Sequence, residues 1–165
     1  FNLPLLIFLD MPGFMLGSHA ERIATMRRGA RALIASAECQ VPKIEFMVRK
    51  SYGVAADAPN SIGLPNSINL RFGWPSGEWG GIPIEGGVAA AYRREIAEAD
   101  DPDAHRAEIE DRLLRLRSPF RAAHRGDVVD LIDPRETRAL ACRFINLAQP
   151  KLAELAQRSK RAVRP

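Results

Sequence analysis

The chain has 165 residues, of which 46% are hydrophobic and 27% are charged, a balance typical of one compact globular domain and not of a disordered chain. Its longest apolar stretch, residues 3–9, is far shorter than the roughly 20 residues of a membrane-spanning helix, and no charged segment precedes it as in a signal peptide. The formal net charge of +4 arises from residue 149 onward. Because the remaining body is neutral, we expect neither a membrane nor a nucleic acid as a partner.

The cysteines and the first residue bear on cellular context. Cys39 and Cys142 are the only thiols, they lie far apart, and no histidine stands at metal-ligand spacing from them. We therefore predict a reduced, cytoplasmic protein without a metal site. Phe1 opens the chain almost directly inside an apolar run, which we interpret as a piece of a longer protein whose upstream part is missing.

Strand-like and helix-like segments alternate along the chain, which indicates an α/β domain. Continuous apolar runs at 3–9 and 44–48 predict strands buried on both faces, and two further strands are expected at 68–72 and 128–132. Helices are predicted at the remaining periodic segments: from Ser18, with Glu21 completing a capping box, to Val41; from 84 or 85 to 98; from Pro102, behind the N-cap Asp101; from Pro119 to about 126; and from Asp133 to Pro150.

The first predicted helix carries an apolar stripe at helical spacing, which we expect to face the core. A glycine in its interior predicts close packing of another backbone there. The stripe consists of Ile23, Met26, Ala30, Leu33 and Ala37, and the glycine is Gly29.

The segment after the second strand is the most informative one for chemistry. A strand that ends at Tyr52-Gly53 and passes into small residues leaves backbone N–H groups unpaired at a helix start, where they can stabilise a developing oxyanion. An ordinary strand-to-helix turn is the alternative interpretation. No phosphate-binding loop, dinucleotide fingerprint or nucleophile elbow is present, and Glu78 and Glu85 are the remaining candidate carboxylates. Glu85 is equally explained as an acid in the first turn of a helix.

Several motifs follow one another in a fixed order between residues 3 and 148. They are LDMPGF at 9–14 with Gly17, VPK at 41–43, RKSYG at 49–53, WPSGEWGG at 74–81, EGGV at 85–88, YRREI at 92–96, and SPF with the following RG and IDPRETR between 118 and 138. In order and spacing they resemble the C-terminal half of the carboxyltransferase (β) subunits of biotin-dependent acyl-CoA carboxylases, of the propionyl-CoA, acetyl-CoA and methylcrotonyl-CoA type.

The resemblance implies a crotonase-like fold, a spiral of ββα units with two stacked sheets, for residues 1–148. Residues 149–165 would form a basic, flexible tail, and the N-terminal domain would be missing. The implied reaction moves a carboxyl group from carboxybiotin to the α carbon of a short-chain acyl-CoA, with backbone oxyanion holes and biotin itself as the base. The implied partners are the N-terminal domain of another subunit, the biotin carboxyl carrier and biotin carboxylase component, and further copies in a hexamer. The fragment alone would be inactive.

Two alternatives on the same fold remain open. One is a decarboxylase-type relative that runs the transfer in reverse. The other is a catalytically degenerate member that serves as a scaffold or an oligomerisation partner.

Carried onto this sequence, the resemblance places backbone oxyanion donors at Val54 and Ala55, next to Gly53. Val54 departs from the family's small residues, and a β-branched side chain tolerates a positive φ poorly, so we expect the turn to depend on its backbone conformation. The segment 57–73 departs as well. Substrate contacts are predicted at Tyr52, Asp57, Gly13, Phe14, Glu85 and Gly86.

Overall fold

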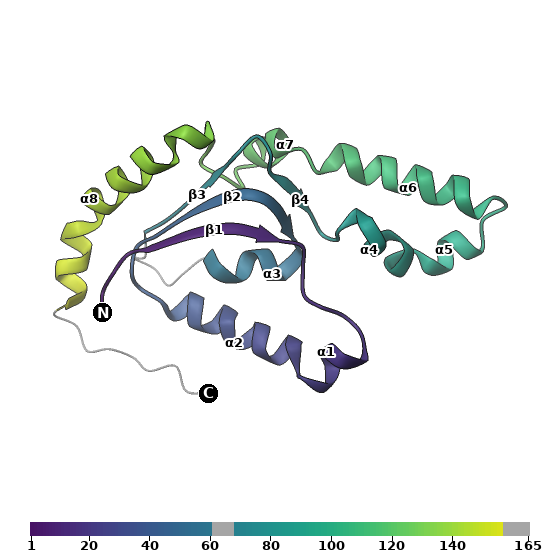
Figure 1. Cartoon of the computed structure of the whole chain (residues 1–165), viewed down its shortest axis with the longest axis horizontal. Helices are drawn as coiled ribbons and strands as arrows, with labels where there is room; N and C mark the ends of the chain where they lie inside the picture. The colour runs from purple at the N-terminus through teal and green to yellow at the C-terminus, as the bar shows by residue number, and fades with distance from the viewer. Residues whose placement is uncertain (61–67, 157–165) are drawn as a thin grey trace.

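The computed structural model describes residues 1–60 and 68–156, and five parallel strands form one sheet within these ranges (Figure 1). Their order is β1-β2-β3-β5, and β4 also pairs with β2. The predicted α/β class is therefore confirmed, whereas residues 61–67 of the departing segment lie outside the described residues. The strands are β1 (Leu5–Met11), β2 (Lys43–Tyr52), β3 (Asn69–Gly73), β4 (Glu78–Gly80) and β5 (Asp130–Leu131).

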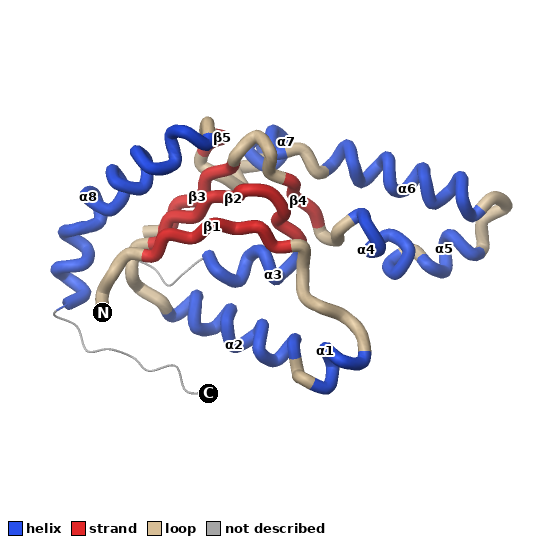
Figure 2. Tube along the Cα trace, in the orientation of Figure 1, coloured by secondary structure: helices blue, strands red, loops and turns tan. Residues whose placement is uncertain are grey.

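Strand β2 lies in the middle of this sheet and pairs with three other strands, β1, β3 and β4 (Figure 2). Its first half, Lys43–Met47, pairs with β3, whereas Lys50–Tyr52 at its end pair with β4. The family resemblance implied two stacked sheets. The described strands instead form one hydrogen-bonded sheet, because β2 is long enough to pair with β3 and β4 in succession.

Helices cover both faces of the sheet and extend beyond one of its ends (Figure 1). Helices α2 and α3 lie on one face, α8 lies on the other, and α4, α5 and α6 form an arm that projects past β4. The helices are α1 (Ser18–Arg22), α2 (Thr25–Glu38), α3 (Gly53–Asp57), α4 (Ile84–Ala91), α5 (Arg93–Ala97), α6 (Pro102–Leu116), α7 (Pro119–His124) and α8 (Thr137–Ala156), with single 3-10 turns η1 (Ala58–Asn60) and η2 (Pro134–Glu136).

The core is built on both faces of β2, since successive side chains of a strand point to opposite faces. Ile44 and Phe46 pack in one cluster with Phe144 of α8. Met47 points to the other face and packs in a second cluster with Trp79 of β4. The strand predicted at 44–48 is therefore confirmed as a buried one.

Strand β1 forms where it was predicted, but the prediction that it is buried on both faces is wrong. Only Leu9 is buried, whereas Leu5, Leu6 and Phe8 are 42–55% exposed. Strand β1 lies at the edge of the sheet. Among the described strands it pairs with β2 alone, so its other side has no strand beside it. An apolar run identifies a strand, but it does not reveal which strands flank it.

The helix predicted from Ser18 forms as two helices, and its capping box is absent. Ala24 has a left-handed φ of 55° and separates α1 from α2, while Gly17 is the N-cap residue of α1. The apolar stripe faces solvent at Met26, so the expectation that it faces the core is wrong. The close packing predicted at Gly29 exists, but the ring of Phe14 and not a backbone fills the space beside it.

Two predicted helices towards the C-terminus differ from the structure. The helix expected at 84–98 is divided at Tyr92 into α4 and α5. Helix α8 does not end at Pro150 but continues to Ala156, with Ala148 and Leu155 buried on either side of the proline. Their packing offsets the roughly 3 kcal/mol that proline costs inside a helix. Residues 149–156 of the predicted tail are therefore helical, and residues 157–165 lie outside the described residues.

Candidate functional site

A cleft of about 1470 Å³ lies at the carboxyl end of β2, between the β2–α3 turn and the arm of α4 and α6. The turn and β3 make one wall mainly polar, and the arm makes the opposite wall mainly apolar. Such a cleft suits a ligand with a polar end and an apolar body. The residues that define the two walls are Tyr52, Val54, Asp57 and Arg71 on the first and Ile84, Tyr92, Leu113 and Leu116 on the second.

The β2–α3 turn brings the start of a helix to this cleft. Gly53 has a left-handed φ of 61°, and a Cβ atom there would lie 3.1 Å from the carbonyl oxygen of Gly81. Glycine is thus favoured both by backbone conformation and by space. Helix α3 begins at once, and the first N–H groups of a helix have no acceptor within the helix. The turn therefore brings the start of α3 next to residues that line the cleft.

Val54 does not strain the turn. The positive φ falls on Gly53, whereas Val54 is already part of α3 and is not among the residues with positive φ. Its side chain is 56% exposed and lines the cleft, while Ala55 and Ala56 point into the core. The departure from the family's small residue thus changes the lining of the cleft and leaves the backbone geometry of the turn intact.

The carboxylate of Glu78 accepts hydrogen bonds that hold the end of β2 in place next to the turn. The buried hydroxyl of Tyr52 donates to Glu78 Oε2 at 3.0 Å, and Arg117 Nη1 donates to the same oxygen at 3.3 Å. Burial and then the hydrogen bond to Glu78 raise the pKa of Tyr52 to about 12, so the phenol stays protonated. The backbone N–H of Trp79 also donates to the backbone carbonyl oxygen of Arg117 at 3.0 Å. These bonds join β2, β4 and the end of α6 at the cleft.

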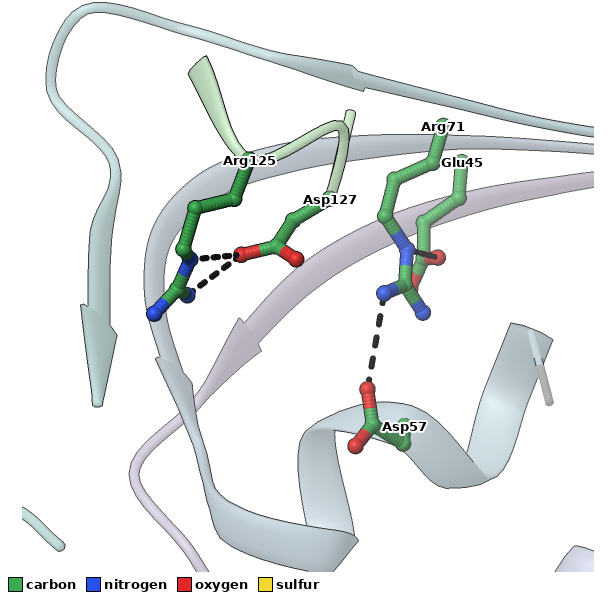
Figure 3. Close-up of polar contacts among 5 residues, drawn as sticks. All are labelled: Glu45, Asp57, Arg71, Arg125 and Asp127. Carbon is green, nitrogen blue, oxygen red and sulfur yellow. Dashed lines mark hydrogen bonds and ion pairs between the residues drawn. The ribbon is translucent and has the colours of Figure 1, made fainter. Parts of the chain in front are cut away.

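A second polar group lies along the wall formed by β3 (Figure 3). Arg71 Nε donates to Glu45 Oε2 at 2.8 Å, and Arg71 Nη1 donates to Asp57 Oδ1 at 3.4 Å. Glu45 and Arg71 are direct partners in the register of β2 and β3. Arg125 and Asp127, after α7, form a separate ion pair in the same view.

Lys43 occupies the interior beneath this group. It is fully buried, and its Nζ donates to the carbonyl oxygen of Ser36 at 2.5 Å and to Ser36 Oγ at 3.1 Å. Burial lowers the pKa of Lys43 below its usual value, and the nearby Glu45 opposes that shift. Lys43 therefore ties β2 to α2 and does not line the cleft.

The structure brings together only some of the predicted site residues. Tyr52, Gly53, Val54 and Asp57 line the cleft, and Ala55 lies behind them with its side chain buried. Gly13 and Phe14 belong to the loop after β1, where Phe14 packs on Gly29, and Gly86 belongs to α4, outside the described lining. Glu85 is also part of α4, and its side chain lies outside the described part of the structure.

Arg71, Arg117 and Glu45 were not singled out from the sequence. A signal existed for two of them, because the buried run 44–48 contains one acid, Glu45, and the run 68–72 contains one base, Arg71. A charge in a buried strand requires a partner. Only the register of β2 and β3, however, shows that these two side chains meet.

Residues 1–60 and 68–156 contain neither a cluster of metal ligands nor a helix that could span a membrane. No group of three or more histidine, cysteine, aspartate or glutamate side chains is arranged to hold a metal ion there. None of the helices in these ranges combines the length and the apolar character that crossing a bilayer would require.

Comparison with known proteins agrees with the fold and the motifs. The carboxyl transferase domain model matches residues 1–163. A propionyl-CoA carboxylase carboxyltransferase subunit of Haloferax mediterranei is 41% identical over 139 residues, which are 84% of this chain and 27% of that protein. The methylmalonyl-CoA decarboxylase subunit alpha of Propionigenium modestum is 34% identical over 156 residues, 94% of this chain and 30% of that protein.

A solved structure extends the agreement to three dimensions. Transcarboxylase 12S, described as a hexamer with methylmalonyl-coenzyme A bound, superimposes with a TM-score of 0.72 at 35% identity, over 98% of this chain and 30% of that chain. The chain thus spans less than a third of the length of these relatives. Because the family model covers almost all of its residues, and the motifs indicated the same relationship, the chain belongs to the carboxyl transferase domain family.

Proposed function

We propose that this chain is the biotin-side half of a carboxyltransferase, which moves a carboxyl group from carboxybiotin to the α carbon of a short-chain acyl-CoA. The observation that carries the proposal is the β2–α3 turn, where left-handed Gly53 starts a helix beside the cleft, with Val54 and Ala55 in its first turn. The N–H groups of a first helical turn have no acceptor within the helix. Membership of the carboxyl transferase domain family supports the reaction class.

The donor set and the shape of the cleft fit the ureido group of biotin. Its carbonyl oxygen would accept hydrogen bonds from Val54 and Ala55, and its apolar ring would lie against Tyr92 and Leu113 on the opposite wall. When bound, carboxybiotin supplies the transferable carboxyl group. The two N–H groups would stabilise negative charge on the oxygen, because their dipoles are oriented before the reaction begins. We assign binding, orientation and charge stabilisation to this chain, and no proton transfer to its side chains.

The rest of the site would come from other polypeptides. We propose that the N-terminal carboxyltransferase domain of another subunit holds the acyl-CoA and that a biotin carboxyl carrier, loaded by a biotin carboxylase, delivers the carboxyl group. The full-length protein would be a cytoplasmic homo-oligomer, and propionyl-CoA or methylcrotonyl-CoA belongs to its expected substrate class. The names of the propionyl-CoA carboxylase and hexameric transcarboxylase relatives support this assignment.

The test is turnover by the full-length protein with carrier and biotin carboxylase, supplied with bicarbonate, ATP and a series of short acyl-CoAs. Val54→Pro removes one N–H donor in the first helical turn, where proline is sterically tolerated, and is expected to lower kcat about 100-fold. Val54→Gly keeps the N–H and is expected to retain activity. Full activity of Val54→Pro would refute the role of this donor, and carboxybiotin that no acyl-CoA consumes would refute the function.

A decarboxylase subunit is the second candidate, favoured by the similarity to the methylmalonyl-CoA decarboxylase subunit alpha. Such a protein would transfer carboxyl groups from methylmalonyl-CoA to the biotin carrier, but would not be served by a soluble biotin carboxylase with ATP. Transfer in neither direction would indicate a scaffold instead.

A further inference from the structure

We propose that Arg71 is a positioning residue of the cleft, which holds the carboxylate of Asp57 in one orientation beside the β2–α3 turn. This inference rests on the proposed function, since it takes the cleft as the place where substrate binds. It adds a residue pair, Glu45 and Arg71, that no motif of the sequence assigns to the site.

The guanidinium of Arg71 is held in a fixed position. Glu45 is fully buried in the central strand, and its Oε2 accepts the hydrogen bond from Arg71 Nε at 2.8 Å. A buried carboxylate is strongly destabilised when it loses its cation, so Glu45 favours the position of Arg71 that keeps this hydrogen bond. The two residues are also direct register partners in β2 and β3, which places the Arg71 side chain by backbone pairing. Only 19% of that side chain is exposed.

This fixed cation contacts a carboxylate that is much more exposed to solvent. Arg71 Nη1 lies 3.4 Å from Asp57 Oδ1, and 66% of the Asp57 side chain is exposed (Figure 3). Burial therefore decreases along the group from Glu45 through Arg71 to Asp57. The most buried pair determines where the exposed carboxylate is held, and not the reverse.

Asp57 lies close in sequence to the proposed backbone donors of the turn. Asp57 is the last residue of α3 and lies three positions after Val54, so both are on the same face of the helix. Both line the cleft, whereas Ala55 and Ala56 between them are buried. Without Arg71, the Asp57 carboxylate would lose this cation and would be free to adopt several orientations in the cleft. Binding an apolar part of a substrate there would then require removing water from an unpaired charge, which costs free energy.

The neighbouring ion pair cannot replace Arg71 in this role. Arg125 is bound to Asp127, only two residues away, through Nε at 3.1 Å. That pair is self-contained within the loop after α7, and Figure 3 shows it apart from the contact between Arg71 and Asp57.

The experiment is a double-mutant cycle in the full-length protein, measured as KM and kcat for the carboxylated biotin carrier at saturating propionyl-CoA. Arg71→Gln is combined with Glu45→Gln, so that no unpaired charge stays buried, and the pair is made in the wild-type and in the Asp57→Asn background. In the wild-type background we expect KM to rise about fivefold with kcat within about twofold, in keeping with a partly exposed ion pair. In the Asp57→Asn background we expect no further rise.

Several readouts separate positioning from a merely structural role. Arg71→Lys keeps the charge without the planar fork and is expected to retain part of the wild-type affinity. Arg94→Gln removes an arginine from a surface pair with Glu98, also at 2.8 Å, and is expected to leave KM unchanged. An equal rise of KM in both backgrounds, or no rise at all, would overturn the positioning role while the proposed function stands. A wild-type protein that turns over no acyl-CoA would overturn both.

Discussion

The ring of Tyr52 lies so close to the backbone of Gly80 that a Cβ atom on Gly80 would approach Tyr52 Cε1 to 2.8 Å. The two residues are direct partners in the register of β2 and β4. Together with the hydrogen bond from Tyr52 to Glu78, this contact holds a strand of three residues against the end of β2. The glycine at position 80 thus leaves room for the ring of a buried tyrosine beside the cleft.

Gly80→Ala is expected to lower the free energy of unfolding by about 1–3 kcal/mol, because a buried aromatic ring bonded at its tip cannot move aside cheaply. Gly81→Ala is the matched control, since a Cβ atom on Gly81 has no neighbour within 4 Å. Urea unfolding of both variants tests the difference. Equal stability of the two variants would contradict the close contact seen at Gly80.

Tyr52→Phe should reveal the raised pKa of this phenol. Because the folded-state value of about 12 exceeds the unfolded value of 10.0, the stabilisation is fully present below about pH 10 and is lost as the pH rises through 12. The unfolding free energy of the wild-type protein should therefore fall between these values relative to the Phe variant. A difference between the two proteins that stays constant across this range would refute the assignment.

Arg71→Met is expected to lower the free energy of unfolding by about 3 kcal/mol, because it leaves the fully buried Glu45 carboxylate without this cation. The matched removal of a surface arginine, Arg94→Met, should change stability by less than about 0.5 kcal/mol. Thermal or urea unfolding distinguishes the two. A small effect at both positions would show that the Glu45–Arg71 pair contributes little.

The start of the last helix predicts an acid-dependent loss of stability. Asp133 accepts a hydrogen bond from the N–H of Arg135 at 2.8 Å, and Asp133 and Glu136 together complete a capping box. The side chain of Arg135, and then its backbone N–H, lower the pKa of Asp133 from 3.8. A lowered folded-state pKa stabilises the fold above the unfolded value, and this contribution is lost as the pH falls through the lowered value. Asp133→Asn should therefore flatten the acid limb of the stability curve, and an unchanged limb would count against this cap.

Local signals in the sequence were sufficient for three features of the structure. Asp101 caps α6 through a hydrogen bond from the N–H of Ala104 at 3.0 Å, as its place before Pro102 indicated. The strand at 44–48 followed from its apolar run, and the helix start at the cleft followed from Tyr52-Gly53. The hydrogen bond of the cap and the backbone conformation at the helix start span only a few residues, so a single segment contains the required information. The strand pairs with distant segments, but its burial on both faces leaves a local signal in its continuous apolar run.

Tertiary structure alone decided the features that depend on neighbours far away in the chain. The exposure of β1 follows from its place at the sheet edge, and the continuation of α8 past Pro150 follows from the burial of Leu155. The cleft group of Glu45, Arg71 and Asp57 needs the register of β2 with β3 and the turn into α3 at once. The sequence by itself therefore determined the family and the helix start after Tyr52-Gly53, whereas the side chains that line and support the cleft are set by strand pairing, which apolar periodicity does not encode.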